Sequence, residues 1–350
     1  MKKIAIYGAG QYGQIFYAAL SNTGVEIDFF IDTDPSKTKL YSKPVYCIEK
    51  IPLETTIYIS VLNLSDRIKE ELTLLGYQNI CTFIETLKLC PTIMNEVSKR
   101  NFLWMRSNPL DMIDTDKIHQ FRELLSDNKS IHTLDQITAF RNTYDMNYYP
   151  YPDGEKEYFP SDVPILDNLT TIRFIDCGAY IGDTVADLMK TNKSIESVVS
   201  FEPDKQNFQK LLSETKKHQG QFITLNAGVW STNTLVNFSN DNSSFSKIGE
   251  EGSFIPVMAL DQTVFSARPN YIKMDIEGAE QEALKGSREI IQTYSPHLAI
   301  CLYHRPQDFW EIPLMIHEMN PHYSMYLRVH EHMGLSTVLY CIPKSGALND

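Results

Sequence analysis

The sequence has few cysteines, and none of them stands in a metal-binding or redox pattern. Its six cysteines are scattered along the chain, with no Cys-x-x-Cys spacing: Cys47, Cys81, Cys90, Cys177, Cys301 and Cys341. This absence argues against a zinc site and against a disulfide framework. Cys177 and Cys301 lie within apolar runs, where a free cysteine usually packs as a small buried side chain.

Long apolar runs and basic clusters are also missing. No apolar stretch approaches the roughly 20 residues that a helix needs to cross a bilayer. The apolar start after Met1 superficially resembles a signal peptide, but Gln11 and Gln14 interrupt it. Acidic residues outnumber basic ones by 44 to 32, giving a net charge of −12. Nucleic acid is therefore not expected as a partner, and we expect a cytoplasmic protein without a membrane span.

The chain is organised around the stretch FIDCGAYIGDT at 174–184. An apolar run ends in Asp176, two glycines follow, and a helical pattern begins at Asp183, which predicts a strand, a tight turn and a helix start. In an open α/β sheet, ligands bind at the carboxyl end of such a strand. The two flanking carboxylates would repel a diphosphate but suit a cationic ligand. S-adenosylmethionine, which carries a sulfonium and an ammonium group, fits this charge.

A second strand is expected at 197–201, where it ends in Glu202 ahead of Pro203 and an amphipathic helix. An acidic residue in this place accepts hydrogen bonds from a ribose diol in dinucleotide folds, and an adenosine ribose has the same diol. The alternative is an ordinary carboxylate before a helix start. The position, one βαβ interval after the glycine turn, favours the ribose role.

A neutral glycine loop lies near the start of the chain. Gly8, Gly10 and Gly13 follow an expected strand at 4–7 and open an expected helix, and Asp32 ends the next strand. In this context the pattern predicts a nucleotide site, because the amides of a neutral loop can approach a diphosphate. No second half that would cradle a nicotinamide follows it.

The first 85 or so residues resemble the small Rossmann-like domain at the front of bacterial sugar acyltransferases. The resemblance rests on GAGQYG at 8–13 and FIDTDP at 30–35, and it implies a nucleotide-sugar ligand. The alternative is a domain that binds nothing and serves assembly. A last strand of this domain is expected at 81–84, and helices are expected at 94–105, 118–125 and 130–144.

Five motifs follow in the second half of the chain: DCGAYIGDT at 176–184, FEP at 201–203, NAGV at 226–229, KMDIEGAE at 273–280 and YHRPQD at 303–308. In this order and spacing, residues 158–342 resemble the FkbM-type methyltransferase family. The resemblance implies an S-adenosylmethionine-dependent enzyme that acts on hydroxyls of sugars or other natural products.

The expected fold class is α/β. A seven-stranded class I methyltransferase domain (158–350) is preceded by the small Rossmann-like domain (1–86) and a helical connecting segment (87–157). The pattern predicts further strands at 222–229, 235–238, 254–258, 271–276 and 297–303, a helix ending at 294, and a terminal hairpin of strands 324–329 and 337–342. The residues expected to bind the methyl donor are Asp176, Gly178, Ala179, Tyr180, Gly182, Asp183, Thr184, Glu202, Pro203, Asn226, Ala227 and Asp275.

Methyl transfer to a hydroxyl requires an acceptor oxygen in line with the donor and a group that removes its proton. Asp275 and His304 end adjacent expected strands, so we predict His304 as the base and Asp275 as the group that orients it or the acceptor. A divalent metal held by Asp275, Glu277 and His304 is an alternative that no diagnostic ligand spacing favours. Arg328 and His330 could reach the acceptor.

The sequence thus predicts an O-methyltransferase for a sugar or sugar nucleotide in glycan or natural-product biosynthesis, with a small-molecule acceptor as partner. Two other functions stay open: an NAD-dependent sugar-nucleotide oxidoreductase that uses Gly8, Gly10, Gly13 and Asp32, and a non-enzymatic nucleotide-sugar-binding module. A homo-oligomer is compatible with the sequence.

Overall fold

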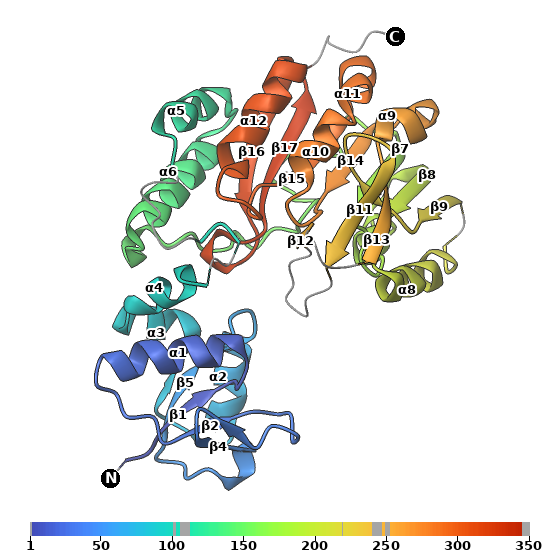
Figure 1. Ribbon diagram of the computed structural model, residues 1–350. Coiled ribbons are helices and arrows are strands. Elements are labelled where there is room, and N and C mark those ends of the chain that lie inside the picture. Colours follow the sequence, from blue (N-terminus) through green and yellow to red (C-terminus); the bar gives the residue numbers. More distant parts are fainter. Residues whose placement is uncertain are drawn as a thin grey trace. The chain divides into compact units, whose positions relative to one another are not determined.

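The computed structural model describes residues 2–100, 103–105, 113–218, 220–239, 247–248 and 253–344. The chain divides into two compact units (Figure 1), which comprise Met1–Asp111 with Gln136–Pro150 and Met112–Asp135 with Tyr151–Asp350. Helix α6 (Asn128–Thr143) is shared between them. Residues 87–157 are therefore divided between the two units.

The first unit is built on a six-stranded sheet in the order β3-β4-β2-β1-β5-β6. Its strands are β1 (Ile4–Tyr7), β2 (Phe29–Ile31), β3 (Lys39–Leu40), β4 (Lys43–Tyr46), β5 (Thr56–Ile59) and β6 (Ile80–Cys81), and its helices include α1 (Gln11–Asn22), α2 (Ser65–Leu74), α3 (Phe83–Leu89) and α4 (Thr92–Ser98). All neighbouring strands pair in parallel except β3, which is antiparallel to β4. This is the predicted Rossmann-like arrangement.

Two predicted boundaries in this unit are wrong. The strand expected at 81–84 ends at Cys81, because Thr82 starts helix α3. The hydroxyl of Thr82 accepts a hydrogen bond from the Glu85 amide, and the Glu85 carboxylate accepts one from the Thr82 amide. This reciprocal cap satisfies two amides of the first helical turn. The helix expected at 94–105 ends at Ser98.

The second unit contains a seven-stranded sheet in the order β16-β17-β15-β14-β7-β8-β9. Its strands are β7 (Thr171–Cys177), β8 (Ser194–Phe201), β9 (Gln221–Leu225), β14 (Tyr271–Met274), β15 (His297–Cys301), β16 (Tyr323–Val329) and β17 (Thr337–Pro343). The helices along this part of the chain are α5 (Thr115–Leu124), α7 (Asp183–Leu188), α8 (Lys205–Thr215), α9 (Leu260–Thr263), α10 (Glu280–Lys285), α11 (Arg288–Tyr294) and α12 (Asp308–Met319).

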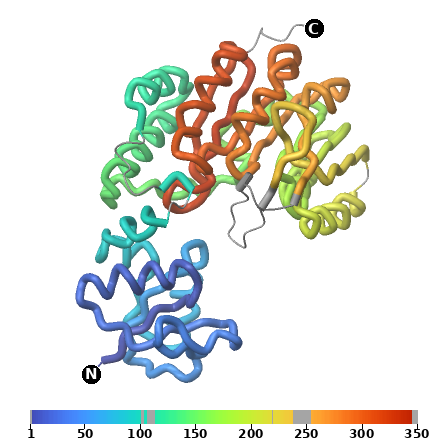
Figure 2. The backbone as a smooth tube through the Cα atoms, viewed as in Figure 1, coloured from blue at the N-terminus to red at the C-terminus, as the bar shows by residue number. Residues whose placement is uncertain are grey.

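Parallel pairing brings together strands that are distant in the sequence. The central strand β7 pairs with β14, and Figure 2 shows this green segment beside the orange C-terminal part of the chain. Every residue of β14 and β15 is buried, as expected for strands covered on both faces. The hairpin of β16 and β17 is antiparallel, and β17 is also antiparallel to β15. The predicted seven-stranded sheet with a terminal hairpin is confirmed.

The strand expected at 222–229 is in fact two strands in different sheets. β9 ends at Leu225, and β10 (Gly228–Val229) pairs with β13 (Ser253–Met258) in a four-stranded sheet that also contains β11 (Thr234–Ser239) and β12 (Lys247–Ile248). Most of the Ser-, Asn- and Gly-rich stretch at 239–252, between β11 and β13, lies outside the described residues.

The helix expected to run to Tyr294 is interrupted at Gly286, between α10 and α11. A Cβ atom on Gly286 would lie 2.2 Å from the carbonyl oxygen of Trp230. A glycine is therefore required where the backbone of the small sheet meets this helical segment. None of the helices in the described part of the chain has the length and apolar character needed to cross a membrane.

Candidate functional site

The glycine turn after β7 has a backbone that only glycine adopts easily. Gly178 and Gly182 have positive φ angles of 79° and 91°. A Cβ atom on Gly178 would lie 1.9 Å from the carbonyl oxygen of Asp275. The amides of Gly178 and Ala179 both donate to the carbonyl of Phe201, at 3.0 and 2.9 Å. The turn is thus fixed against the carboxyl ends of β14 and β8, its two neighbours in the sheet.

Tyr180 and Glu202 form one side of this turn. Tyr180 has a positive φ of 47°, which is unusual for a residue other than glycine and is found most often at functional sites. The Glu202 carboxylate accepts hydrogen bonds from the amides of Tyr180 and Asp204, both at 2.8 Å. Burial raises the pKa of Glu202 to about 7. Each carboxylate oxygen keeps a lone pair that a ligand hydroxyl can use.

Asp176 has a different partner from the one expected. Its side chain is fully buried, and Oδ1 lies 3.1 Å from the ammonium of Lys273. Lys273 also donates to the carbonyl of Gly178 at 2.7 Å. The expectation that Asp176 faces a cationic ligand is therefore corrected, because an internal lysine matches its charge. The pair of Asp176 and Lys273 supports the glycine turn, because the Lys273 ammonium contacts both the Asp176 carboxylate and the Gly178 carbonyl.

The remaining residues of the predicted donor site lie around Glu202 and the start of α7. Asn226 donates to the carbonyls of Glu202 and Pro203, at 2.9 and 3.0 Å, so its amide group holds the loop after β8. The next residue, Ala227, is buried. Asp183 is exposed and Thr184 is buried in the first turn of α7.

A second cluster lies at the carboxyl ends of β14 and β15, centred on His304. Its side chain is 2% exposed. Its Nδ1 atom lies 2.9 Å from Oε1 of Glu280, whereas Nε2 lies 3.4 Å from Oδ1 of Asp275 and 3.6 Å from Oε2 of Glu277. The predicted catalytic pair, His304 and Asp275, is thus brought together by the fold.

The charge of the cluster bears on the predicted role of His304 as a base. Burial by itself would lower the pKa of His304, but the three carboxylates of Glu280, Asp275 and Glu277 outweigh it and raise that pKa to about 10. The surroundings of the ring therefore favour its protonated form, which donates hydrogen bonds. The role of His304 as the proton acceptor stays a prediction.

Asp275 is held as a carboxylate by neighbours that the sequence did not single out. The hydroxyls of Tyr158 and Tyr303 donate to its two oxygens, at 2.8 and 3.1 Å. Burial works to raise the pKa of Asp275, but Lys273, His304 and these hydroxyls hold it below its ordinary value. Lys273 lies within the motif at 273–280 and Tyr303 within the motif at 303–308, so the sequence offered a signal for both residues. Tyr158 lies outside the five motifs, so its role became visible only in the structure.

The glycine loop of the first unit is explained largely by packing. Gly8 has a φ of 103°, and a Cβ atom on Gly13 would lie 2.0 Å from the carbonyl oxygen of Gly8. Around Gly10 a Cβ atom would meet nothing within 4 Å. The carboxylate of Asp32 accepts a hydrogen bond from the Ala9 amide at 2.8 Å and pairs with Lys37 at 2.9 Å. Asp32 therefore braces its own loop, and a nucleotide there stays a prediction.

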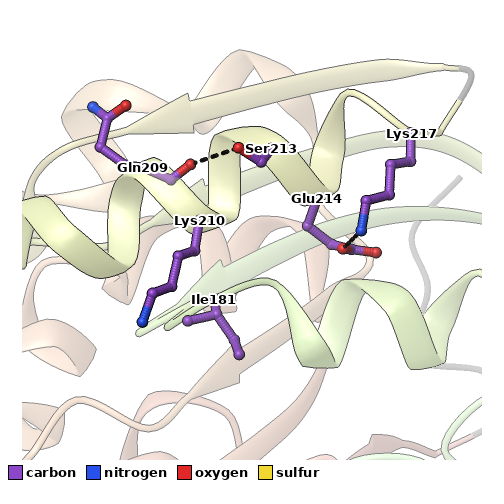
Figure 3. Close-up of a pocket in the computed structure, with 6 residues that line it drawn as sticks. All are labelled: Ile181, Gln209, Lys210, Ser213, Glu214 and Lys217. Carbon is purple, nitrogen blue, oxygen red and sulfur yellow. Dashed lines mark hydrogen bonds and ion pairs between the residues drawn. The ribbon is translucent and has the colours of Figure 1, made fainter.

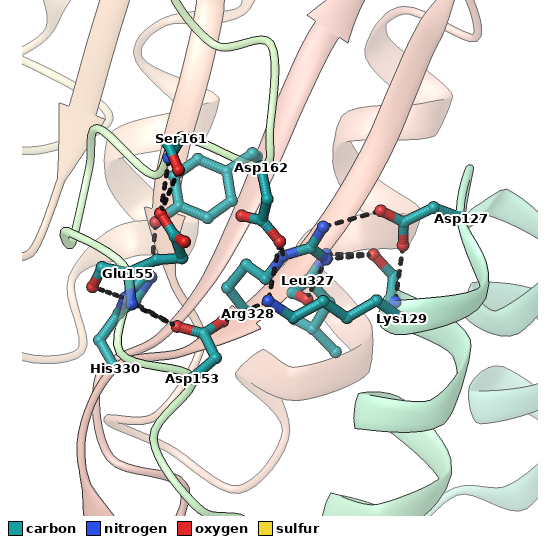
Figure 4. A network of polar contacts seen from close by, with 11 residues as sticks. Asp127, Lys129, Asp153, Glu155, Ser161, Asp162, Leu327, Arg328 and His330 are labelled. Carbon is teal, nitrogen blue, oxygen red and sulfur yellow. Dashed lines mark hydrogen bonds and ion pairs between the residues drawn. The ribbon is translucent and has the colours of Figure 1, made fainter.

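Arg328 and His330 are held by contacts within the second unit. The Arg328 side chain is 1% exposed, and its guanidinium lies 2.7 Å from Asp127 and 2.8 Å from Asp162. Figure 4 shows the guanidinium between these two carboxylates. The imidazole of His330 lies 2.7 Å from the hydroxyl of Tyr340. Both side chains connect segments of the second unit, and an acceptor contact by either of them stays a prediction.

A separate surface hollow lies over α8 (Figure 3). Its lining residues are Ile181, Gln209, Lys210, Ser213, Glu214 and Lys217. Glu214 and Lys217 form an ion pair on this helix. The hollow contains none of the carboxylates around His304, so we do not count it with the site.

The fold and the site define an α/β protein with a methyltransferase-type sheet and a glycine turn against Glu202. Residues 176–334 match the family model described as the Methyltransferase FkbM domain. The structure of Methyltransferase FkbM from Methylobacillus flagellatus KT overlaps with a TM-score of 0.65 at 22% identity, covering 97% of this chain and 90% of that one. Residues 176–334, a little under half of the chain, are therefore similar to the FkbM methyltransferase domain.

A curated relative is similar over part of the same domain. The hexuronic acid methyltransferase AglP of Haloferax volcanii is 31% identical over 125 residues, which are 34% of this chain and 51% of AglP. The chain thus matches about half the length of this relative.

Proposed function

We propose that the chain is an S-adenosylmethionine-dependent O-methyltransferase that modifies a hydroxyl of a sugar or sugar nucleotide. The observation that carries the proposal is the turn from Gly178 to Gly182, fixed between Glu202 and Asp275 within the residues that are similar to the FkbM methyltransferase domain. Glycine turns of this kind place a ligand at the carboxyl ends of the strands. The name of the relative AglP, a hexuronic acid methyltransferase, supports a sugar acceptor.

The residues of the turn fit the methyl donor. Glu202 has unused lone pairs beside the turn, so it can accept both hydroxyls of the adenosine ribose. Tyr180, a residue that is 51% exposed, can cover a ligand at the open side of the turn. S-adenosylmethionine supplies an electrophilic methyl group on its sulfonium sulfur.

The acceptor hydroxyl belongs beside Asp275. This carboxylate stays ionised, and its side chain is 26% exposed. It can therefore accept a hydrogen bond from an acceptor hydroxyl and orient the oxygen. Besides His304, the carboxylates of Asp275 and Glu277 are the groups here that can receive the proton.

Titration calorimetry with S-adenosylmethionine and S-adenosylhomocysteine tests the donor site. We expect both ligands to bind, and Glu202→Ala to weaken binding by about tenfold or more, because two charge-assisted hydrogen bonds to the ribose are lost. Glu196→Gln is the matched control, since Glu196 lies at the exposed end of the same strand. Methyl transfer to uronic-acid and neutral sugar acceptors, followed by mass spectrometry, then tests the acceptor class.

Tight NAD binding without any binding of the adenosyl ligands would overturn the proposal. Such a result would instead support the NAD-dependent oxidoreductase hypothesis. Equal weakening by Glu202→Ala and Glu196→Gln would place the donor elsewhere.

A further inference from the structure

Tyr158 has a strained backbone in the segment that leads into the seven-stranded sheet. It lies outside residues 176–334, which match the family model. Its φ angle is +65°, in the left-handed region that residues other than glycine rarely adopt. Such a conformation is unfavourable in itself and is retained most often at functional sites. The residue is also buried, with 6% exposed, so its neighbours must hold it in this conformation.

Two buried tyrosines of the sheet hold the backbone of Tyr158 on both sides. The Tyr158 amide donates a hydrogen bond to the hydroxyl of Tyr340 at 3.3 Å, and the hydroxyl of Tyr271 donates one to the Tyr158 carbonyl. Tyr271 belongs to β14 and Tyr340 to β17, and both side chains are fully buried. Because a buried polar group that loses its partner is costly, these contacts fix Tyr158 relative to the sheet.

This fixed backbone places the Tyr158 hydroxyl on the carboxylate of Asp275. The hydroxyl donates to Oδ2 of Asp275 at 2.8 Å, and the hydroxyl of Tyr303 donates to Oδ1 at 3.1 Å. The Tyr158 ring is held as well, since the ammonium of Lys273 lies 5.1 Å from its centroid. Each oxygen of Asp275 thus has one fixed donor and keeps a lone pair for another. The carboxylate is therefore oriented before any acceptor binds.

We propose that Tyr158 is a positioning residue for methyl transfer, which orients Asp275 so that a free lone pair of this carboxylate receives the acceptor hydroxyl. This role rests on the proposed function. In the reaction, the acceptor oxygen bonds to the methyl carbon while the carbon–sulfur bond breaks and its electron pair goes to sulfur. The hydroxyl proton leaves along its hydrogen bond to Asp275. A misplacement of about 1 Å can slow such a transfer about 100-fold, so the orientation of Asp275 matters for the rate.

Tyr158→Phe removes the hydroxyl and keeps the ring, so it tests the positioning role directly. We expect kcat for methyl transfer from S-adenosylmethionine to the uronic-acid or neutral sugar acceptors to fall about tenfold or more, because Asp275 loses one of its two fixed donors. The affinity for S-adenosylhomocysteine, measured by calorimetry, should change less than about twofold, because the ribose site at Glu202 keeps its contacts.

Tyr323→Phe is the matched control for the loss of a buried hydroxyl. Tyr323 is also buried, and its hydroxyl donates to the carbonyl of Pro296 at 2.7 Å. Each variant loses one buried tyrosine hydrogen bond, so urea denaturation should show a similar loss of stability in both. Only Tyr158→Phe should lower kcat. Equal kcat values in the two variants would show that Tyr158 serves the fold alone and would overturn its positioning role.

The carbon-13 resonance of the Asp275 carboxylate gives a second measurement that needs no acceptor. In the full chain labelled with carboxyl-carbon-13 aspartate, Asp275→Asn identifies the signal. This signal should shift in Tyr158→Phe and stay in place in Tyr323→Phe, because only the first variant removes a donor from the carboxylate. A signal that does not move in Tyr158→Phe would overturn the positioning role.

Calorimetry on the unmodified chain separates this role from the proposed function. If S-adenosylhomocysteine binds, but Tyr158→Phe leaves kcat or the Asp275 signal unchanged, only the role of Tyr158 falls. If S-adenosylhomocysteine does not bind the unmodified chain, the methyltransferase proposal is overturned, and the role of Tyr158 in methyl transfer falls with it.

Discussion

At the scale of single residues, the site depends on charges that the chain itself neutralises. Lys273 illustrates this, since it is buried and lies between the carboxylate of Asp176 and the carbonyl of Gly178. Charges of this kind are costly to bury singly, and they are stable only as a pair. The motif at 273–280 contains Lys273, but the sequence does not show that its side chain pairs with Asp176 at the glycine turn.

Lys273→Met should destabilise the second unit by about 3–5 kcal/mol, because it leaves Asp176 as an unpaired buried charge. Urea denaturation monitored by circular dichroism measures the loss. The exposed pair of Lys285 and Glu282 gives the control, and Lys285→Met should change stability little. A loss no larger than the control's would show that Asp176 does not need this partner.

The raised pKa of Glu202 should make stability depend on pH. Because burial lifts this pKa from 4.5 to about 7, the folded chain binds a proton more readily than the unfolded chain. The contribution of Glu202 to stability is therefore greatest below pH 4.5 and falls as the pH rises through about 7. The unfolding free energy of Glu202→Gln relative to the unmodified chain should thus rise by on the order of 2–3 kcal/mol across this range. A constant difference would contradict the shift.

At the scale of elements, the sequence predicts strand identity well where both faces are buried. The mainly apolar sequences of β7, β14 and β15 were sufficient to predict these strands, and the glycine turn after β7 was identified from its residues. Boundaries were missed where tertiary contacts decide them. Residues 225–228 change from one sheet to another because β10 pairs with β13, and no local pattern carries that pairing.

The break between α10 and α11 is of the same kind, and a substitution tests it. Gly286→Ala should lower the unfolding temperature by several degrees, since the new methyl group would lie 2.2 Å from the Trp230 carbonyl. Gly10→Ala is the control, because its surroundings are open and its φ of −96° suits any residue. Equal effects of the two substitutions would show that the close approach at Gly286 relaxes easily.

At the scale of the whole molecule, the sequence predicted two α/β regions but not which residues belong to each. The second unit takes in Met112–Asp135 ahead of part of the first unit, and composition gives no sign of such an exchange. Of the candidate site, the sequence predicted the turns and strand ends that its motifs form. The side-chain partnerships of Lys273, Glu280 and Tyr158 depend on strand order, and the raised pKa of His304 depends on carboxylates gathered by that order.

The two units should bind their ligands separately. If the first unit binds a nucleotide sugar, Gly10→Glu should abolish that binding, because a carboxylate in the loop repels a diphosphate. The open space around Gly10 leaves room for the side chain. Binding of S-adenosylhomocysteine should be unchanged. Calorimetry with UDP-, GDP- and CDP-sugars measures the first effect, and nucleotide-sugar binding that survives Gly10→Glu would place it outside this loop.

The buried guanidinium of Arg328 has a consequence for how the chain is made. It pairs with Asp127, 201 residues earlier, and with Asp162, 166 residues earlier. During synthesis these two carboxylates leave the ribosome long before their partner exists. The start of α6 and the segment before β7 therefore cannot reach their final state until β16 has been translated, whereas the sheet of the first unit, complete by Cys81, is free to form from the outset.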